Sequence, residues 1–248
     1  MKPVDAHCHI DFDQYSEDRE EVIQRSRERL EFIVNAGSCL ENNRKALQLQ
    51  EEYPDFVIAN LGLHPTYTDK FDQLEEVKEQ IREEDPAAVG EIGLDHHHVD
   101  SPEMRDRQEE VFRQMLSLAE ELDKPVVVHS RDAEEKCVDI LSEYDLEGVM
   151  LHCFNGSPEL AGKAADRGYF IGVTTQVLYS NRVKEIVESL SIEDMLLETD
   201  SPFLYRGERN EPLNVIESAE KIGELKEADK AQVVEKTSAN AVELFRDG

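Results

Sequence analysis

The sequence predicts an α/β fold, and within that class a (β/α)8 barrel of the TIM type with parallel strands. Short apolar segments alternate along the chain with longer charged segments that have the period of an amphipathic helix. Eight such strand–helix pairs occupy 248 residues, a common length for this barrel. A doubly wound open sheet is the alternative, but no Gly-rich phosphate-binding motif follows the first strand.

The first half of the chain contains four of these pairs, and its helices end at clear stop signals. The strands are expected at Val4–Asp11, Glu31–Gly37, Phe56–Gly62 and Ala87–Leu94, and the helices that follow them at Glu17–Arg29, Glu41–Tyr53, Phe71–Glu84 and Pro102–Leu122. Pro54 ends the second helix, and Asp85-Pro86 ends the third.

The second half repeats the alternation. Strands are expected at Pro125–His129, Gly148–Phe154, Gly168–Thr174 and Asp194–Thr199, followed by helices at Ala133–Tyr144, Pro158–Arg167, Arg182–Leu190 and Val215–Lys226, with a last helix near Lys230–Phe245. Because each helix connects two strands, parallel pairing is expected. No linker divides the chain, so one domain is expected over residues 1–248.

The composition is strongly acidic. Fifty-six acidic residues against 27 basic ones give a net charge of −29, spread along the helices. Such a surface either repels nucleic acid and anionic membranes at low salt or keeps the protein soluble in a salty cytoplasm. We favour the second interpretation, an acidic proteome, because the charge is global. The absence of a signal-like or membrane-spanning segment, and four cysteines without a Cys-x-x-Cys pair, predict a cytoplasmic protein with reduced thiols.

The first strand contains His7-Cys8-His9. Residues two apart in a strand project from the same face, so His7 and His9 are expected to point together and Cys8 the other way. Two adjacent imidazoles are a good start for a divalent-metal site. Alone, a His-x-His pair is more often solvated or hydrogen-bonded, but further metal-binding residue types occur at later strand ends.

Polar residues interrupt the later apolar strands near their carboxyl ends, where the loops of such barrels hold the reactive groups. These residues are His64, Glu91, His129, His152 and Asp200. Burying a carboxylate or an imidazole there is costly unless it is paired or bound to metal. We therefore expect the side chains to converge on a metal centre at the mouth of the barrel.

This donor set exceeds the needs of one tetrahedral ion and suits two divalent ions with water between them. Glu91 would bridge both ions, and Asp200 would accept a proton from the water and pass it to the leaving group. Imidazoles favour Zn²⁺ or Mn²⁺, whereas phosphate chemistry favours Mg²⁺, so the identity of the ions stays open. The expected reaction is metal-assisted hydrolysis, with Asp200 and Glu91 as catalytic residues.

Six motifs occur in order along nearly the whole chain. They are Asp5-Ala6-His7-Cys8-His9, Gly62-Leu63-His64-Pro65, Gly90-Glu91-Ile92-Gly93-Leu94-Asp95, His129-Ser130-Arg131-Asp132-Ala133, His152-Cys153-Phe154-Asn155-Gly156-Ser157 and Glu198-Thr199-Asp200-Ser201-Pro202, and a late Arg209-Asn210-Glu211-Pro212 accompanies them. Together they resemble the TatD family of metal-dependent deoxyribonucleases, (β/α)8 barrels of the amidohydrolase superfamily.

The resemblance implies a set of roles for these residues. The metal ligands would be His7, His9, Glu91, His129, His152 and Asp200. Asp200 would also be catalytic, and His64 would lie near the substrate phosphate. Members of the family cut DNA with Mg²⁺ or other divalent ions, some as 3′→5′ exonucleases, whereas others resemble deacylases of D-aminoacyl-tRNA.

The sequence departs from the family pattern in two loops. His96-His97-His98 follows Gly93-Leu94-Asp95, where the family usually has aromatic residues, and Asn155 occupies a serine-like position. Both departures concern substrate specificity more than metal binding. The triple histidine is expected to be a solvated loop, and adventitious or regulatory metal binding is its alternative.

The remaining candidates concern packing and substrate contact. Cys8 and Cys153 are expected to face outward and pack under the helices. Arg131, Arg206 and Arg209 lie in mouth loops, where they would either hold phosphate or balance local acidic charge. The expected substrate contacts are His64, Arg131 and Asn155.

The leading functional hypothesis is a two-metal phosphodiesterase acting on single-stranded DNA or 3′ ends. With no Trp, 7 Tyr and 9 Phe, few stacking contacts and a short footprint are expected. The alternative enzyme is a D-aminoacyl-tRNA deacylase or another ester or amide hydrolase. The alternative of another class is a metal-stabilised binding scaffold. Neither a membrane nor an obligate protein partner is expected.

Overall fold

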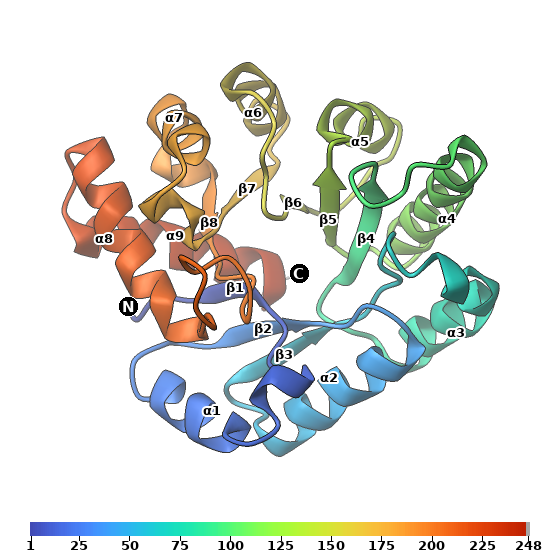
Figure 1. The fold of residues 1–248 in the computed structure, drawn as a ribbon, viewed down its shortest axis with the longest axis horizontal. Coiled ribbons are helices and arrows are strands. Elements are labelled where there is room, and N and C mark those ends of the chain that lie inside the picture. Colours follow the sequence, from blue (N-terminus) through green and yellow to red (C-terminus); the bar gives the residue numbers. More distant parts are fainter. Residues whose placement is uncertain (247–248) are drawn as a thin grey trace.

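The computed structural model describes residues 1–246 as a barrel of eight parallel strands inside a ring of helices (Figure 1). The strands are β1 (Asp5–Cys8), β2 (Ile33–Ala36), β3 (Val57–Asn60), β4 (Val89–Asp95), β5 (Val126–Arg131), β6 (Val149–Leu151), β7 (Phe170–Val173) and β8 (Met195–Leu197). This arrangement confirms the expected fold class. The assignment of one domain to residues 1–248 stays a prediction, and residues 247–248 lie outside the described part.

The helices follow the strands in the expected alternation. They are α1 (Arg19–Arg27), α2 (Leu40–Glu52), α3 (Leu74–Glu84), α4 (Pro102–Glu121), α5 (Glu134–Leu141), α6 (Pro158–Ala165), α7 (Asn181–Ser189), α8 (Val215–Lys226) and α9 (Lys230–Phe245). Pro102 and Pro158 occupy first helical positions, where a missing N–H costs nothing, and Ser101 and Ser157 cap these two helices. None of the helices within residues 1–246 is both long and apolar enough to cross a membrane.

The barrel consists of a three-stranded sheet, β1-β2-β3, and a five-stranded sheet, β4-β5-β6-β7-β8. Isolated bridges join the two sheets at both seams, Leu61 with Val89 and Cys8 with Ser201. At the second seam the N–H of His9 donates to the carbonyl oxygen of Ser201 at 2.8 Å. Both seams therefore lie beside residues expected in the metal centre.

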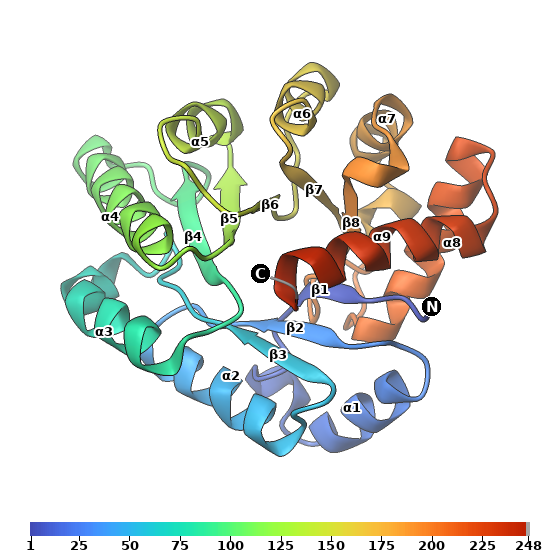
Figure 2. The ribbon, with the colours of Figure 1, turned by 180° about the vertical axis from the view of Figure 1, so that it is seen from behind.

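Two apolar cores hold the layers together. The larger core fills the space between the strands and the surrounding helices. The smaller one fills the barrel interior with side chains such as Phe32, Val127 and Met150, and it includes Leu244 and Phe245 of α9. Figure 2 shows α9 crossing this end of the barrel. Because α9 closes the amino-terminal end of the strands, the carboxyl-terminal end is the one that stays open.

Several strands are shorter than the apolar runs predict. β1 ends at Cys8, β6 at Leu151 and β8 at Leu197. His9, His152 and Asp200 therefore lie just beyond regular strands, where the backbone is free to turn their side chains inward. Because these polar residues lie beyond the regular strands, the apolar periodicity predicts strands that are too long.

β4 and β5 approach each other closely at Gly93. Its φ is +140°, a region that L side chains rarely adopt, and a Cβ there would overlap the carbonyl oxygen of His129. The backbone of β4 can therefore bring Glu91 next to His129 only because residue 93 is a glycine.

We expect Gly93→Ala to lower the free energy of unfolding of the metal-free protein by about 1–3 kcal/mol, because the methyl group pushes β4 away from β5. Urea denaturation in the presence of a chelator measures this change. Gly168→Ala is the matched control, since Gly168 also has a positive φ of +82° but no atom near the added Cβ. Equal losses for the two variants would show that only backbone conformation matters at Gly93.

Candidate metal centre

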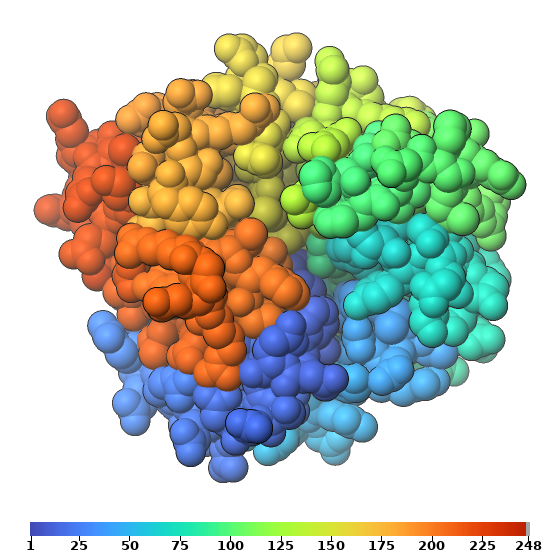
Figure 3. Space-filling view, in the orientation of Figure 1, coloured from blue at the N-terminus to red at the C-terminus, as the bar shows by residue number. Residues whose placement is uncertain are grey.

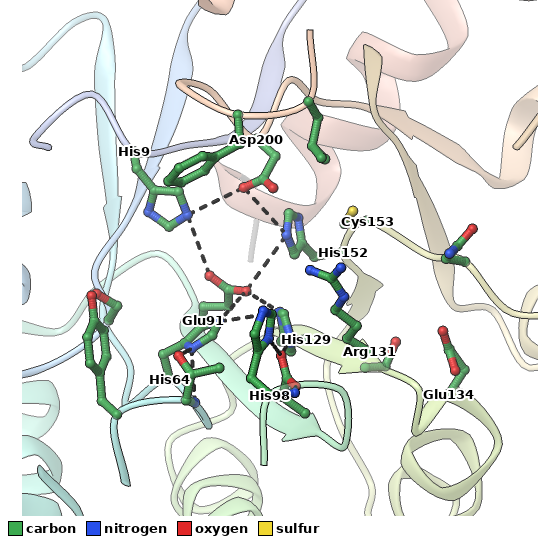
Figure 4. Close-up of a pocket in the computed structure, with 18 of the residues that line it drawn as sticks. His9, His64, Glu91, His98, His129, Arg131, Glu134, His152, Cys153 and Asp200 are labelled. Atoms are coloured by element: carbon green, nitrogen blue, oxygen red, sulfur yellow. Dashed lines mark hydrogen bonds and ion pairs between the residues drawn. The ribbon is translucent and has the colours of Figure 1, made fainter. Parts of the chain in front are cut away.

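The carboxylate of Glu91 on β4 lies at the centre of the site and is 2% exposed. Its oxygen Oε2 faces the histidines of the first strand segment. This oxygen lies 3.5 Å from Nε2 of His7 and 3.6 Å from Nε2 of His9, and these two ring nitrogens are 3.2 Å apart. His7 and His9 thus point to the same side, as the strand alternation predicts. Figure 4 shows the ring of His9 facing Glu91.

The other oxygen of Glu91, Oε1, faces a different set of histidines. It lies 2.8 Å from Nδ1 of His129, 3.1 Å from Nε2 of His64 and 3.7 Å from Nε2 of His152. Nδ1 of His64 is 2.7 Å from the hydroxyl oxygen of Thr66, which turns Nε2 toward the cluster. One carboxylate thus contacts five imidazoles, divided between its two oxygens.

Asp200 closes the cluster from the opposite side. Its oxygen Oδ1 lies 3.5 Å from Nε2 of His9, 3.7 Å from Nε2 of His152 and 3.8 Å from Nε2 of His7. A left-handed backbone conformation, φ 54°, follows the end of β8 here, and the N–H of Asp200 donates to the carbonyl oxygen of His7 at 3.0 Å. The β8–β1 seam therefore positions this carboxylate.

The spacing of these donor atoms fits a metal ion. Ligand atoms about 2.0–2.2 Å from a tetrahedral ion are roughly 3.4 Å from one another. The contacts among His7, His9, Glu91 and Asp200 run from 3.2 to 3.8 Å. Imidazole nitrogens and carboxylate oxygens are also the donor types that divalent transition metals prefer.

A second set of groups holds the imidazoles in place. Nε2 of His129 is 3.0 Å from Oδ2 of Asp95, and Nδ1 of His152 is 2.6 Å from Oε2 of Glu198. Asp95 and Glu198 are both fully buried. Such outer partners fix the ring orientation and increase the basicity of a ligating imidazole. The sequence prediction did not include them, although both carboxylates interrupt apolar strand ends.

The electrostatics of the metal-free cluster keep its central carboxylates ionised. Burial alone would raise the pKa of Glu91, but the surrounding imidazoles hold it well below the usual value. Burial also opposes ionisation of Asp200, and the hydrogen bond with His9 and the charge of His152 lower its pKa instead. Both carboxylates are thus available as anionic ligands at neutral pH.

Two imidazoles bind protons more tightly than usual in the absence of metal. Burial lowers the pKa of His9, but Asp200 and Glu91 outweigh it and raise the pKa to about 9. In the same way, Asp95 and Glu91 raise the pKa of His129 to about 9 against the effect of burial. A metal ion must therefore displace protons from both rings.

We expect metal affinity to decrease as the pH falls below about 9, because the protonated forms of His9 and His129 compete with the cation. At about pH 7 metal binding should release protons. Calorimetric titrations in buffers of different ionisation enthalpy measure this release. A binding enthalpy that does not depend on the buffer would contradict the expectation.

We expect Asp95→Asn and Glu198→Gln each to weaken metal binding about 10–100-fold, because His129 and His152 lose the carboxylates that orient them. Equilibrium dialysis followed by metal analysis measures the dissociation constants. Asp139→Asn, on the exposed face of α5, is the control for loss of one negative charge. Unchanged affinity in both variants would show that the carboxylates do not support the ligands.

The cluster lies at the bottom of a cavity of about 500 Å³. In the space-filling view the open face of the barrel is hollowed near its centre (Figure 3). His64, Arg131 and Asn155, the expected substrate contacts, all line this cavity. Phe12, Tyr67 and Phe203 line it as well, so a few aromatic rings lie at the mouth of the barrel. These aromatic rings come from loops, which strand periodicity does not address.

Cys153 has an orientation that the sequence prediction gave wrongly. β6 has already ended at Leu151, and Cys153 takes a left-handed conformation with φ 46°, so strand alternation no longer applies. Its side chain lines the cavity, and its Sγ lies close to ligand atoms of His152 and Asp200. Burial raises the pKa of the thiol well above its ordinary value. Cys8, in contrast, packs in the outer core as expected.

The loop histidines and arginines divide between the cavity and the surface. His97 and His98 are both exposed, as the solvated-loop prediction expects, whereas His96 is partly buried. His97 pairs with Asp132, and His98 also lines the cavity. Arg209 binds Asp18 at 2.6 Å and Glu211 at 3.2 Å, which favours the charge-balancing interpretation for this residue.

A parallel barrel with imidazoles and carboxylates at the carboxyl ends of its strands has the architecture of a metal-dependent hydrolase. Residues 4–246 match the family described as TatD related DNase. A Bacillus subtilis protein named uncharacterized metal-dependent hydrolase YabD is 40% identical over 98% of both chains. Human deoxyribonuclease TATDN3 is 32% identical over 98% of this chain and 94% of its own.

Solved structures agree with this match. The crystal structure of YJJV, a TatD homologue from Escherichia coli, superposes with a TM-score of 0.87 and 31% identity, covering 98% of this chain and 97% of that one. The chain therefore belongs to the TatD related DNase family, and it is a metal-dependent hydrolase.

Proposed function

We propose that this hydrolase is a two-metal phosphodiesterase that cleaves DNA. The observation that carries the proposal is the division of the histidines between the two oxygens of Glu91. A carboxylate with donors on both sides suits a bridging role between two ions. Bound divalent ions, whether Mg²⁺, Mn²⁺ or Zn²⁺, would supply Lewis acidity toward a phosphoryl oxygen and lower the pKa of water.

The residues that would hold the ions are those expected from the sequence: His7, His9, Glu91, His129, His152 and Asp200. The four histidines of this set surround the two oxygens of Glu91. His64 is proposed to contact the substrate phosphate. Its Nε2 faces the same oxygen of Glu91 as His129 and lines the cavity, which supports a role at the edge of the cluster.

Asp200 is proposed to move the proton of the reaction. Its carboxylate is ionised, because the hydrogen bond with His9 and the charge of His152 outweigh burial. It also lies at the cavity, so a water molecule and a leaving oxygen can both reach it. Asp200 would accept the proton of the attacking water and return it to the leaving oxygen.

The lining of the cavity supports a nucleic-acid end as substrate. Arg131 is the only lysine or arginine among the described residues that line it, and it would bind a phosphate. Phe12 and Phe203 lie 6.1 Å apart at their ring centroids, and they offer apolar faces to a base. Because the outer surface is acidic, a short contact at a single-stranded or 3′ end is favoured over a long tract.

Glu134 supports a second candidate function. This carboxylate lines the cavity. An acidic group in this position repels a phosphate and attracts an ammonium group. The amino group of a D-aminoacyl ester would suit it, so a D-aminoacyl-tRNA deacylase or another ester or amide hydrolase is the alternative.

We expect metal-reconstituted protein to degrade 3′-labelled single-stranded DNA faster than duplex DNA, and Asp200→Asn to lower kcat about 10²–10⁴-fold through loss of the proton acceptor. Gel analysis of product lengths measures the rate and the polarity. Assays at low and molar KCl separate the effect of the acidic surface from the chemistry.

Asp139→Asn serves as the charge control, and metal analysis of each variant separates loss of ligand from loss of base. Hydrolysis of a D-aminoacyl ester by protein that leaves every DNA intact would replace the nuclease proposal with the deacylase.

A further inference from the structure

We propose that His98 binds a substrate phosphate adjacent to the one that reacts at the metal centre. The inference rests on the proposed phosphodiesterase function. His98 lies on the loop after β4, its side chain is 54% exposed, and it lines the cavity. It makes no contact with Glu91 or Asp200 within residues 1–246, so it belongs to the substrate side of the cavity rather than to the donor cluster.

Asp95 fixes the position of the His98 ring. Nδ1 of His98 lies 2.9 Å from Oδ2 of Asp95, and the backbone N–H of His98 donates to Oδ1 of Asp95 at 2.6 Å. The carboxylate is itself fully buried and cannot follow a moving ring. With Nδ1 held in this way, Nε2 is the atom at the far end of the ring and the one available to a ligand.

The same carboxylate oxygen connects His98 to the metal centre. Oδ2 of Asp95 also lies 3.0 Å from Nε2 of His129, whose Nδ1 faces Glu91. The order of groups is therefore Glu91, His129, Asp95 and His98, from the cluster outward. A phosphate held at Nε2 of His98 is consequently next to the reacting group and distinct from it.

Arg131 supplies a cationic group at the same strand ends. Asp95 and Arg131 are register partners on β4 and β5, and Arg131 has no ion-pair partner in the part of the chain that the structure describes. Figure 4 shows Arg131 and His98 on the His129 side of Glu91, away from His9. A guanidinium and an imidazole on one side of a cavity form a suitable pair for phosphate oxygens.

The chemistry of the ring agrees with an anionic ligand. The ring lies between the carboxylate of Asp95 at Nδ1 and the proposed phosphate at Nε2, so both of its nitrogens face an anionic group. A polynucleotide has a phosphate on each side of most nucleotides, whereas an isolated phosphodiester has only the reacting one. His98 would therefore favour a polynucleotide over a small phosphodiester.

The test compares His98→Ala with the wild-type holoenzyme on oligothymidylate and on bis(p-nitrophenyl) phosphate. We expect His98→Ala to raise KM for oligothymidylate about tenfold, with kcat within about twofold, because one charge-assisted hydrogen bond is lost. On bis(p-nitrophenyl) phosphate both constants should stay within about twofold of wild type. His98→Gln, which keeps an N–H donor, should recover part of the loss.

His97→Ala is the matched control, because His97 is a neighbouring exposed histidine that pairs with Asp132 and is absent from the cavity lining of the described residues. It should behave as wild type, and metal content should be equal in all variants. An equal loss on both substrates, or no loss on oligothymidylate, would overturn the role of His98 while leaving the nuclease intact. A wild-type protein that cleaves only the small diester would overturn the DNA proposal and, with it, the phosphate ligand.

Discussion

The structure depends on one buried carboxylate that faces five imidazoles. An ionised group as enclosed as Glu91 is tolerable only when opposite charge and hydrogen bonds surround it. The imidazoles provide this environment, and they are themselves held by further carboxylates, Asp95 and Glu198. Counted together with Asp200, the site contains four acidic groups at close range. Carboxylates and imidazoles gathered around one space are favourable ligands for divalent cations.

The strands and the loops of the barrel contribute differently to this site. The donor atoms lie on strands or within three residues of a strand end, so their positions follow from backbone pairing. The cavity rim, in contrast, comes largely from loops, where Phe203 and His98 are exposed, together with the exposed Arg131 at the end of β5. Donors on strands keep the spacing that hydrolysis requires. A rim built from loops can differ in its substrate contacts while the centre stays the same.

The sequence was informative about the barrel and about which residues converge, because strand–helix alternation and polar interruptions are local patterns. All eight strands and their order were predicted, and His7 and His9 share a face as period two requires. Features that depend on where a strand stops were not predictable in this way. Cys153 turned inward because β6 ended early, which no periodicity reveals.

The contacts between segments far apart in the sequence were also beyond local patterns. The contact of Asp95 with His129 depends on the close approach of β4 and β5 at Gly93. The aromatic rings at the mouth come from loops after different strands, and only the closed barrel brings them together. The assignment of individual metal ligands stays a prediction, although the geometry assembles every residue that the sequence nominated.

The isolated bridges at the two seams affect how the two sheets are held together. The three-stranded sheet and its loops provide His7, His9 and His64, while the five-stranded sheet and its loops provide Glu91, His129, His152 and Asp200. A cation bound by ligands from both groups would link two sheets that otherwise share few backbone hydrogen bonds. Protection of the seam amides against hydrogen exchange would then report whether the proposed metal site is occupied.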